Sequence, residues 1–288
     1  AAVALAALSA PAFAESSKVK LLDTKFSFEG PFGTYDYKAV QRGFQVYKEV
    51  CAACHSLSLV AYRNLQQIGL SEAAVKAIAA DVQIRDLNDV GEMAERAGRP
   101  ADRFKAPFAN EAAARAVNNG AYPPDLSLIV KARPNGARYL YSLLQGYEDF
   151  AKLTDAQKKE MGLAADFKMQ PNMHFNKYFP GHQIAMVKPL NDGQITYNEE
   201  ATKDGIKTDL PQLAKDLVHF LAWASEPKME ERKKTGVKAV IFLLTALLGR
   251  PRLRQNRRAQ CNQHGRAHRL QDAEADQPVD IGRQSTQY

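Results

Sequence analysis

The sequence predicts a mostly helical fold with long loops and an apolar helix near its C-terminus. Apolar side chains recur with a period of about 3.6 residues in several segments, which is typical of amphipathic helices. No series of alternating strands is present, and turn-forming runs such as residues 122–125 and 180–181 separate the helical segments. The 288 residues are 45% hydrophobic and 25% charged, as in globular proteins. Long loops without a sheet need something to pack around, and a large bound cofactor would serve.

Five segments carry helix signals, and one carries a hairpin signal. In residues 37–50 an apolar stripe that includes Val40, Phe44 and Tyr47 predicts a helix. Ser71 is a suitable N-cap for a helix over 71–81. The other predicted helices are residues 110–118, ended by an Asn-Gly pair, residues 137–144, and residues 211–225, which begin with a proline. We expect a short hairpin in residues 184–197, around the Asn-Asp-Gly run at 191–193.

The first fourteen residues are apolar and uncharged and end in Ala12-Phe13-Ala14. Small residues at those two alanine positions suit a signal-peptidase site, so we interpret residues 1–14 as the remaining part of a signal peptide. The alternative is a buried Ala-rich helix. The signal interpretation predicts an exported domain over residues 15–229.

The C-terminal region divides into a short apolar segment and a basic tail. We interpret residues 230–249 as a transmembrane anchor, although its apolar run, Val237–Gly249, has only thirteen residues, against about 17–25 for a full span. A core or interfacial helix is the alternative. Basic residues are denser after the run, which predicts a cytoplasmic C-terminus. Residues 250–288 hold eight arginines and four acids and lack a hydrophobic period, so we expect them to be disordered.

Charge and cysteine content exclude two further classes of protein. The formal net charge is +7, but the excess is concentrated in the tail rather than on a folded face, so we predict no nucleic-acid partner. Three cysteines in 288 residues exclude a disulfide-stapled scaffold.

The motif Cys51-Ala52-Ala53-Cys54-His55 is the strongest chemical signal in the chain. The C-x-x-C-H pattern is typical of c-type haem attachment. Two thiols on one short turn can add to the two vinyl groups of a haem, and the adjacent imidazole can then bind the iron as the proximal ligand. The sequence therefore predicts one covalently bound haem c, with Cys51, Cys54 and His55 at the site.

Other interpretations of this motif need features that the sequence lacks. A thioredoxin-like pair would need a βαβ context, a zinc site would need a second ligand pair, and a structural disulfide would not require the histidine. The distal iron ligand stays open on spacing alone. Its candidates are Met93, Met161, Met169, Met173, Met186, Met229, His174, His182 and His219.

Several further motifs resemble the cytochrome c1 family, the haem-bearing subunits of cytochrome bc1 complexes. In order along the chain they are Phe26–Gly33, Val46–Leu57, Asn118–Ser127, Lys131–Arg133, Tyr139–Leu144, Asn172–Asn176 and Phe179–Met186. The resemblance runs from about Phe26 to Leu244, after which the chain departs from the family pattern.

The resemblance implies a fold, a site and a set of partners. It implies a c-type cytochrome haem domain with a C-terminal membrane-anchor helix, with Met186 as the distal ligand and with Arg133 and Tyr139 near the haem propionates. It also implies an electron-transfer subunit, not an enzyme by itself, that accepts an electron from the Rieske iron–sulfur protein beside cytochrome b. A soluble c-type cytochrome would be the acceptor.

The expected location is the bacterial inner membrane, crossed once, with the haem domain in the periplasm. Two rival functions remain at this point: a haem enzyme of peroxidase type with an open sixth site, and a free periplasmic electron carrier.

Overall fold

A computed structural model describes residues 19–247, so the predicted signal segment and basic tail lie outside the described residues. The chain divides after Glu230 into two units. Within residues 19–230 the α-helices are α1 (Tyr37–Glu49), α2 (Glu72–Ala80), α3 (Glu111–Val117), α4 (Gly136–Gln145), α5 (Asp155–Glu160), α6 (Glu199–Lys203) and α7 (Leu210–Ser225). Three 3₁₀ helices are η1 (Cys51–Ala53), η2 (Tyr62–Ile68) and η3 (Phe150–Lys152). The mostly helical class is confirmed.

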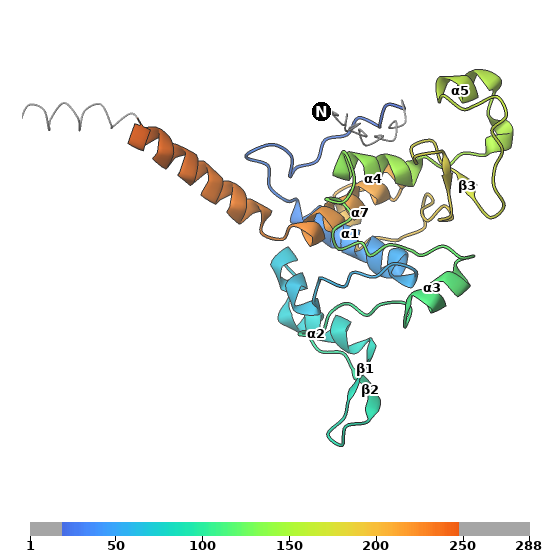
Figure 1. Cartoon of the computed structure of the whole chain (residues 1–288). Coiled ribbons are helices and arrows are strands. Elements are labelled where there is room, and N and C mark those ends of the chain that lie inside the picture. Colours follow the sequence, from blue (N-terminus) through green and yellow to red (C-terminus); the bar gives the residue numbers. More distant parts are fainter. Residues whose placement is uncertain (1–18, 248–288) are drawn as a thin grey trace, which may run out of the picture. The chain divides into compact units, whose positions relative to one another are not determined.

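The helices α1 and α7 form the centre of this unit and lie side by side (Figure 1). Asp36 caps α1 by accepting a hydrogen bond from the backbone N–H of Ala39, and Asp209 caps α7 in the same way. The two helices approach closely at Gly43, where a Cβ atom would lie only 2.0 Å from the backbone oxygen of Asp216. A larger residue at this position would therefore push the helices apart.

A buried ion pair joins the same two helices. Arg42 of α1 donates from Nε and Nη2 to the carboxylate of Asp216 on α7, at 2.8 and 2.9 Å. Tyr197 and Gln212 donate to the same carboxylate, each at 2.9 Å. Because every contact is a hydrogen bond to a charged group, the buried carboxylate is well satisfied.

The helix α4 packs against the other side of this centre by contact with α7 (Figure 1). Leu140, Leu143 and Leu144 of α4 belong to one large hydrophobic core with residues of α1 and α7. A smaller, separate cluster consists of Leu153, Met161 and Phe175. The main core therefore connects α4 and α1 through α7.

Strands are few, and the hairpin predicted in residues 184–197 is wrong. The strands β1 (Gln83–Leu87) and β2 (Met93–Ala97) form an antiparallel hairpin, and β3 (His174–Phe175) pairs with β4 (Gln183–Ile184). The Asn-Asp-Gly run instead forms a turn held to the start of α7. Gly193 N–H donates to the Thr208 carbonyl at 2.8 Å, and Asp192 accepts from Leu210 N–H at 2.6 Å.

The five predicted helices are confirmed, with small shifts at their ends. Beyond them, a further helix occupies residues 229–247 of the described chain. Six of its large apolar side chains are more than half exposed, namely Val240, Ile241, Phe242, Leu243, Leu244 and Leu247. Within residues 19–247, no helix has both the length and the apolar character that crossing a membrane requires.

Candidate haem-attachment site

The two cysteines and His55 lie on a single tight turn directly after α1. The 3₁₀ helix η1 starts at Cys51, and its carbonyl accepts hydrogen bonds from the N–H groups of Cys54 at 3.1 Å and His55 at 2.8 Å. Both cysteines are free thiols. The turn therefore holds two thiols and one imidazole within a few residues, as haem attachment requires.

The two thiols differ in their surroundings. Cys51 packs against the main core, and burial raises the pKa of its thiol to about 12. Cys54 is exposed. A partly buried thiol with a raised pKa is a poor nucleophile and redox group, so this pair does not resemble an activated redox C-x-x-C motif.

The ring of His55 is oriented by a backbone carbonyl. Its Nδ1 lies 2.8 Å from the carbonyl oxygen of Pro124, and because a carbonyl can only accept, Nδ1 carries the proton. Burial is the main influence on this ring and lowers its pKa. The neutral ring therefore presents an unprotonated Nε2, the form that binds a metal.

The predicted distal ligand, Met186, is half-buried against the main core. Tyr147 donates a hydrogen bond from its hydroxyl to the Met186 carbonyl at 3.0 Å. Asn176 is fully buried at the base of the same loop and donates to the Leu143 carbonyl, at the end of α4, at 2.8 Å. The Met186 loop is thus fixed by Asn176 to α4 and by Tyr147 to the segment that directly follows α4.

The side chains of Arg133 and Tyr139 lie near each other. Burial raises the pKa of Tyr139, while the nearby charge of Arg133 acts in the opposite direction. Arg133 is exposed and lines one surface hollow with Pro124 and Asp125. Tyr139 in turn contributes to the raised pKa of Tyr147, after burial. Arg133 and Tyr139 therefore lie between Pro124, which contacts the His55 ring, and Tyr147, which contacts the Met186 backbone.

The other distal candidates lie in different surroundings. Met93 and Met173 are exposed, Met161 and Met169 belong to the smaller cluster, and Met229 lies in the main core. The ring of His219 makes edge contacts with Phe26 and Phe28, and its Nδ1 contacts the Lys215 carbonyl at 2.9 Å. The ring of His174 belongs to an exposed residue of β3.

His182 is a special case among these candidates. It is buried, has a positive φ of 59° and stacks on Phe175, and its Nδ1 is buried without a hydrogen-bond partner. Only Met186 combines partial burial on the main core with a direct hydrogen bond from Tyr147 to its backbone.

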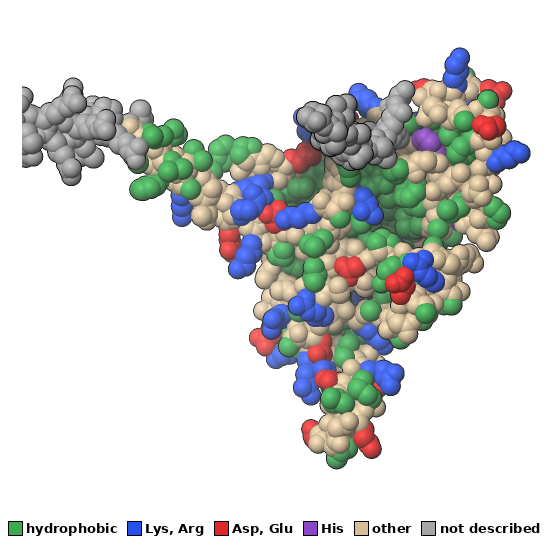
Figure 2. Space-filling view, viewed as in Figure 1, with side chains coloured by type: hydrophobic (Ala, Val, Ile, Leu, Met, Phe, Trp, Pro, Cys, Tyr) green, Lys and Arg blue, Asp and Glu red, His purple; other side chains and the backbone are tan. Residues whose placement is uncertain are grey.

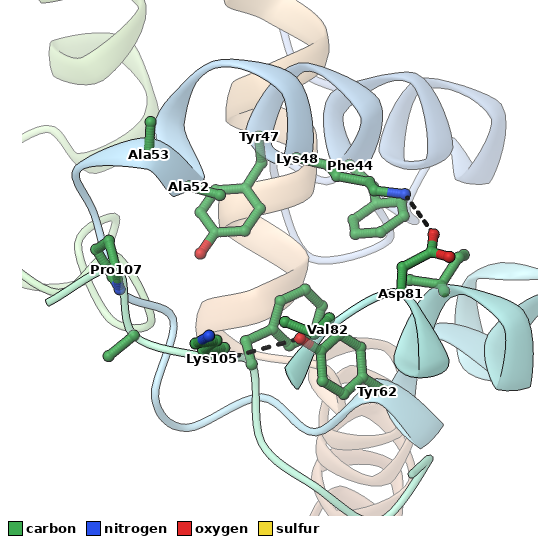
Figure 3. A pocket seen from close by; sticks show the side chains of 13 residues that line it. Phe44, Tyr47, Lys48, Ala52, Ala53, Tyr62, Asp81, Val82, Lys105 and Pro107 are labelled. Carbon is green, nitrogen blue, oxygen red and sulfur yellow. Dashed lines mark hydrogen bonds and ion pairs between the residues drawn. The ribbon is translucent and has the colours of Figure 1, made fainter. Parts of the chain in front are cut away.

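A cavity beside the attachment turn is lined by two residues of the motif but not by its reactive groups. It is lined by Ala52 and Ala53 of the motif, by aromatic residues such as Tyr47 and Tyr62, and by Lys48, which pairs with Asp81 at 3.5 Å (Figure 3). Neither cysteine nor His55 lines it. The chemically reactive groups of the motif therefore do not line this cavity.

The residues present fit a haem better than a bare metal ion. Among the residues that the structure describes, no group of three His, Cys, Asp or Glu side chains could hold a metal ion. A haem iron needs only axial protein ligands, because the porphyrin supplies the equatorial nitrogens. Hydrophobic side chains also gather in a hollow of the surface beside α4 and α7 (Figure 2), as a large apolar ring would require.

The comparison with known proteins agrees with these features. The cytochrome c1 family matches residues 26–256. This chain belongs to the cytochrome c1 family. The match continues past Leu244, where the sequence motifs predicted a departure from the family pattern.

Individual cytochrome c1 relatives come from bacteria, plants and fungi. "Cytochrome c1" of Rhodospirillum rubrum is 45% identical over 84% of this chain and 89% of its own length. "Cytochrome c1-1, heme protein, mitochondrial" of Solanum tuberosum is 48% identical over 76% of this chain. "Cytochrome b-c1 complex catalytic subunit, mitochondrial" of Candida albicans is 44% identical over 76% of this chain and 70% of its own length. The match spans 63% of the Solanum protein.

Family membership implies a haem c cofactor for this chain and supports the haem interpretation of the motif. Three residues that position the site have weak or no sequence signals. Tyr147 and Asn176 act across the fold; Asn176 ends one of the family-like motifs, but nothing in the local sequence indicates what either side chain contacts. Asp125 follows two prolines and precedes Ser127 by two residues, a spacing typical of side-chain-to-backbone turns.

Proposed function

We propose that this chain is the haem-bearing electron-transfer subunit of a cytochrome bc1 complex. One haem c is attached covalently through Cys51 and Cys54, with His55 and Met186 as the axial ligands of the iron. The chain is not an enzyme by itself. It accepts an electron from the Rieske iron–sulfur protein and passes it to a soluble c-type cytochrome.

The observation that carries this proposal is the hydrogen bond between His55 Nδ1 and the Pro124 carbonyl, at 2.8 Å. It fixes the tautomer and the plane of a half-buried imidazole directly beside two free thiols. Such an outer hydrogen bond is the usual partner of a metal-bound histidine. Neither a disulfide nor a zinc finger would explain this combination.

When bound, the haem supplies a one-electron redox centre. The protein residues hold it and tune it. His55 is held in one orientation by Pro124, and Met186 is held through its backbone by Tyr147. Thioether ligation raises the potential relative to ligation by two histidines, which suits an acceptor for a Rieske centre with a potential of about −150 to +300 mV.

Arg133 and Tyr139 would meet the propionate edge of the haem. Arg133 is exposed, and within residues 19–247 the one hydrogen bond of its guanidinium runs to the carbonyl of the neighbouring Ala132, at 3.2 Å. Its guanidinium is therefore available for a charge-assisted pair with a carboxylate. Tyr139 is half-buried beside it and would shield this edge from water.

The test of the axial ligand is spectroscopy of Met186→Leu beside Met161→Leu in the purified full chain. Met161 lies in the smaller cluster, so its replacement controls for the loss of a buried thioether. We expect the near-infrared charge-transfer band of Met-ligated iron to disappear only in Met186→Leu. The same band in both variants and wild type would reject Met186.

Two further measurements on the same proteins test the rival functions and the covalent attachment. A peroxidase-type site predicts that cyanide or carbon monoxide binds rapidly to the wild-type chain; we expect rapid binding only after Met186→Leu. Colour that is lost from wild type on acid–acetone extraction would reject covalent attachment through Cys51 and Cys54.

We propose a location in the bacterial inner membrane, with the haem domain in the periplasm beside cytochrome b and the Rieske protein. The exposed apolar side chains over residues 240–247 and the basic residues after them support an anchor in this region. Extraction from membranes that requires detergent is the expected result. Release by high salt alone would instead favour a free periplasmic carrier.

A further inference from the structure

The side chain of Asp125 connects the loop after Pro124 to the segment that follows His55. Its Oδ2 accepts hydrogen bonds from the Ser56 hydroxyl at 2.7 Å and from the Ser58 N–H at 2.8 Å. Its Oδ1 accepts from the Ser127 N–H at 2.8 Å. One carboxylate therefore joins two chain segments that are far apart in the sequence.

Two further hydrogen bonds run between the same segments. The Leu126 N–H donates to the Ser56 carbonyl at 2.9 Å, and the Leu59 N–H donates to the Ser127 hydroxyl at 3.0 Å. Ser127 is fully buried. The contact is thus an ordered junction rather than a chance approach of two surface loops.

This junction lies directly beside the acceptor of the His55 ring. The Pro124 carbonyl belongs to the peptide group between Pro124 and Asp125. The proline ring fixes φ on one side of that carbonyl, and the three hydrogen bonds of the carboxylate anchor the residue on the other side. The direction of the carbonyl is therefore determined from both ends.

We propose that Asp125 is a positioning residue for the proximal histidine. By fixing the Pro124 carbonyl, it keeps the His55 Nδ1–H hydrogen-bonded and the imidazole plane constant. The inference rests on the proposed function of His55 as an iron ligand. Within the described residues, Asp125 makes no hydrogen bond to the ring, and its position acts on the ring through Pro124. Its charge also favours the protonated imidazole, but less than the Pro124 hydrogen bond does.

The test measures solvent exchange of the His55 Nδ1 proton by NMR in the reduced, haem-bearing full chain. The variants are Asp125→Ala and Asp125→Asn. The matched control is Asp102→Ala, because Asp102 also accepts three hydrogen bonds, from Arg96 Nη1 at 2.7 Å, Arg96 Nη2 at 2.8 Å and the Arg99 N–H at 2.7 Å, but it is not joined to His55.

In Asp125→Ala we expect exchange of the His55 proton to become at least about tenfold faster, because the loop is then free to open locally. Asp125→Asn should give an intermediate rate, because its amide oxygen can still accept from Ser56 and Ser58, while its NH₂ group would face the Ser127 donor. Asp102→Ala should exchange at the wild-type rate.

An exchange rate in Asp125→Ala within about twofold of wild type would overturn the proposal, as would equal acceleration in Asp102→Ala. If Asp125→Ala does not fold, Ser56→Ala replaces it, since it removes only the 2.7 Å bond; an unchanged rate there overturns the proposal equally.

The amount of attached haem, measured by the pyridine haemochrome, separates two kinds of failure. Wild-type chain without covalent haem would refute the proposed function and this inference with it. Wild-type chain with haem, together with unchanged exchange in the Asp125 variants, would refute only the positioning role.

Discussion

Replacing Asp216 with alanine should cause a large loss of stability, because it leaves a buried guanidinium without its counter-ion. The side chains of Arg42 and Asp216 are only 13% and 1% exposed. Breaking a buried ion pair by removing one partner typically costs about 3–5 kcal/mol. The same variant also removes the acceptor of the Tyr197 hydroxyl and of the Gln212 amide, so we expect the upper part of this range.

The assay is urea denaturation of the full chain, followed by far-ultraviolet circular dichroism, with Asp204→Ala as the matched control. Asp204 pairs with Lys38 at 3.1 Å, but these side chains are 48% and 63% exposed. A surface pair of this kind contributes about 0–1 kcal/mol. The two alanine variants each break one ion pair, but only Asp216→Ala breaks a buried pair and also removes the acceptor of Tyr197 and Gln212.

A double variant, Arg42→Met with Asp216→Leu, tests the physical reason for the loss. Because no charge is left unpaired, we expect it to be more stable than Asp216→Ala. If Asp216→Ala is within about 1 kcal/mol of Asp204→Ala, the buried pair does not contribute as the geometry indicates, and the reasoning is refuted.

Three further predictions concern the core, the distal loop and the helix crossing. Burial lowers the pKa of His219 in the folded protein. Below the ordinary histidine pKa of about 6.5, unfolding therefore takes up a proton, and the free energy of unfolding falls as the pH falls. His219→Gln should reduce the slope of this free energy against pH by up to about 1.4 kcal/mol per pH unit, and an unchanged slope between acidic and neutral pH would contradict this. Tyr147→Phe removes the hydrogen bond to the Met186 carbonyl. The equilibrium constant for displacement of the Met186 thioether by added imidazole, measured by optical titration, should then rise about fivefold. Titration curves identical to wild type would show that this hydrogen bond does not support Met186. Gly43→Ala should lower the free energy of unfolding, measured by urea denaturation, by about 1–3 kcal/mol, because its Cβ would meet backbone atoms of α7. The control Gly236→Ala has open space around the new Cβ and should be neutral or stabilising. Equal effects of the two variants would argue against the close approach of α1 and α7.

The helices were predictable because their signals are local. The apolar stripe of residues 37–50 and the cap at Ser71 depend on neighbours a few positions apart, and both helices form where the sequence predicts them. The β1–β2 hairpin was missed for the opposite reason. Its strands are largely exposed and lack an apolar alternation, and Arg96 and Asp86 pair across it at 2.8 Å, a contact that no periodicity reveals.

The failed hairpin prediction at residues 191–193 shows a limit of turn chemistry. Gly193 has a positive φ of 68°, as the sequence suggested. The partners of this turn, however, are Thr208 and Leu210 rather than a second strand. A turn-forming sequence determines the local backbone path, whereas the partner of that path depends on the tertiary fold.

The same division between local and distant signals holds at the candidate site. The Cys51-to-His55 motif is a property of one turn and can be read directly from the sequence. The orientation of its imidazole depends on Pro124, which lies 69 positions away. Tyr147 supports Met186 across 39 positions. Sequence spacing left nine distal candidates open, because burial and hydrogen bonding distinguish them only in three dimensions.

The two proposed axial ligands reach the site from different supports, and α7 is the element that these supports share. His55 follows α1, which packs on α7 at Gly43 and through the pair of Arg42 with Asp216. Met186 is fixed by side-chain hydrogen bonds to the region of α4, which packs on α7 as well. Helix packing in the main core therefore positions the supports of both proposed ligands. Buried interfaces are close-packed and deform little, so in the proposed function these supports would keep His55 and Met186 in place around the haem iron.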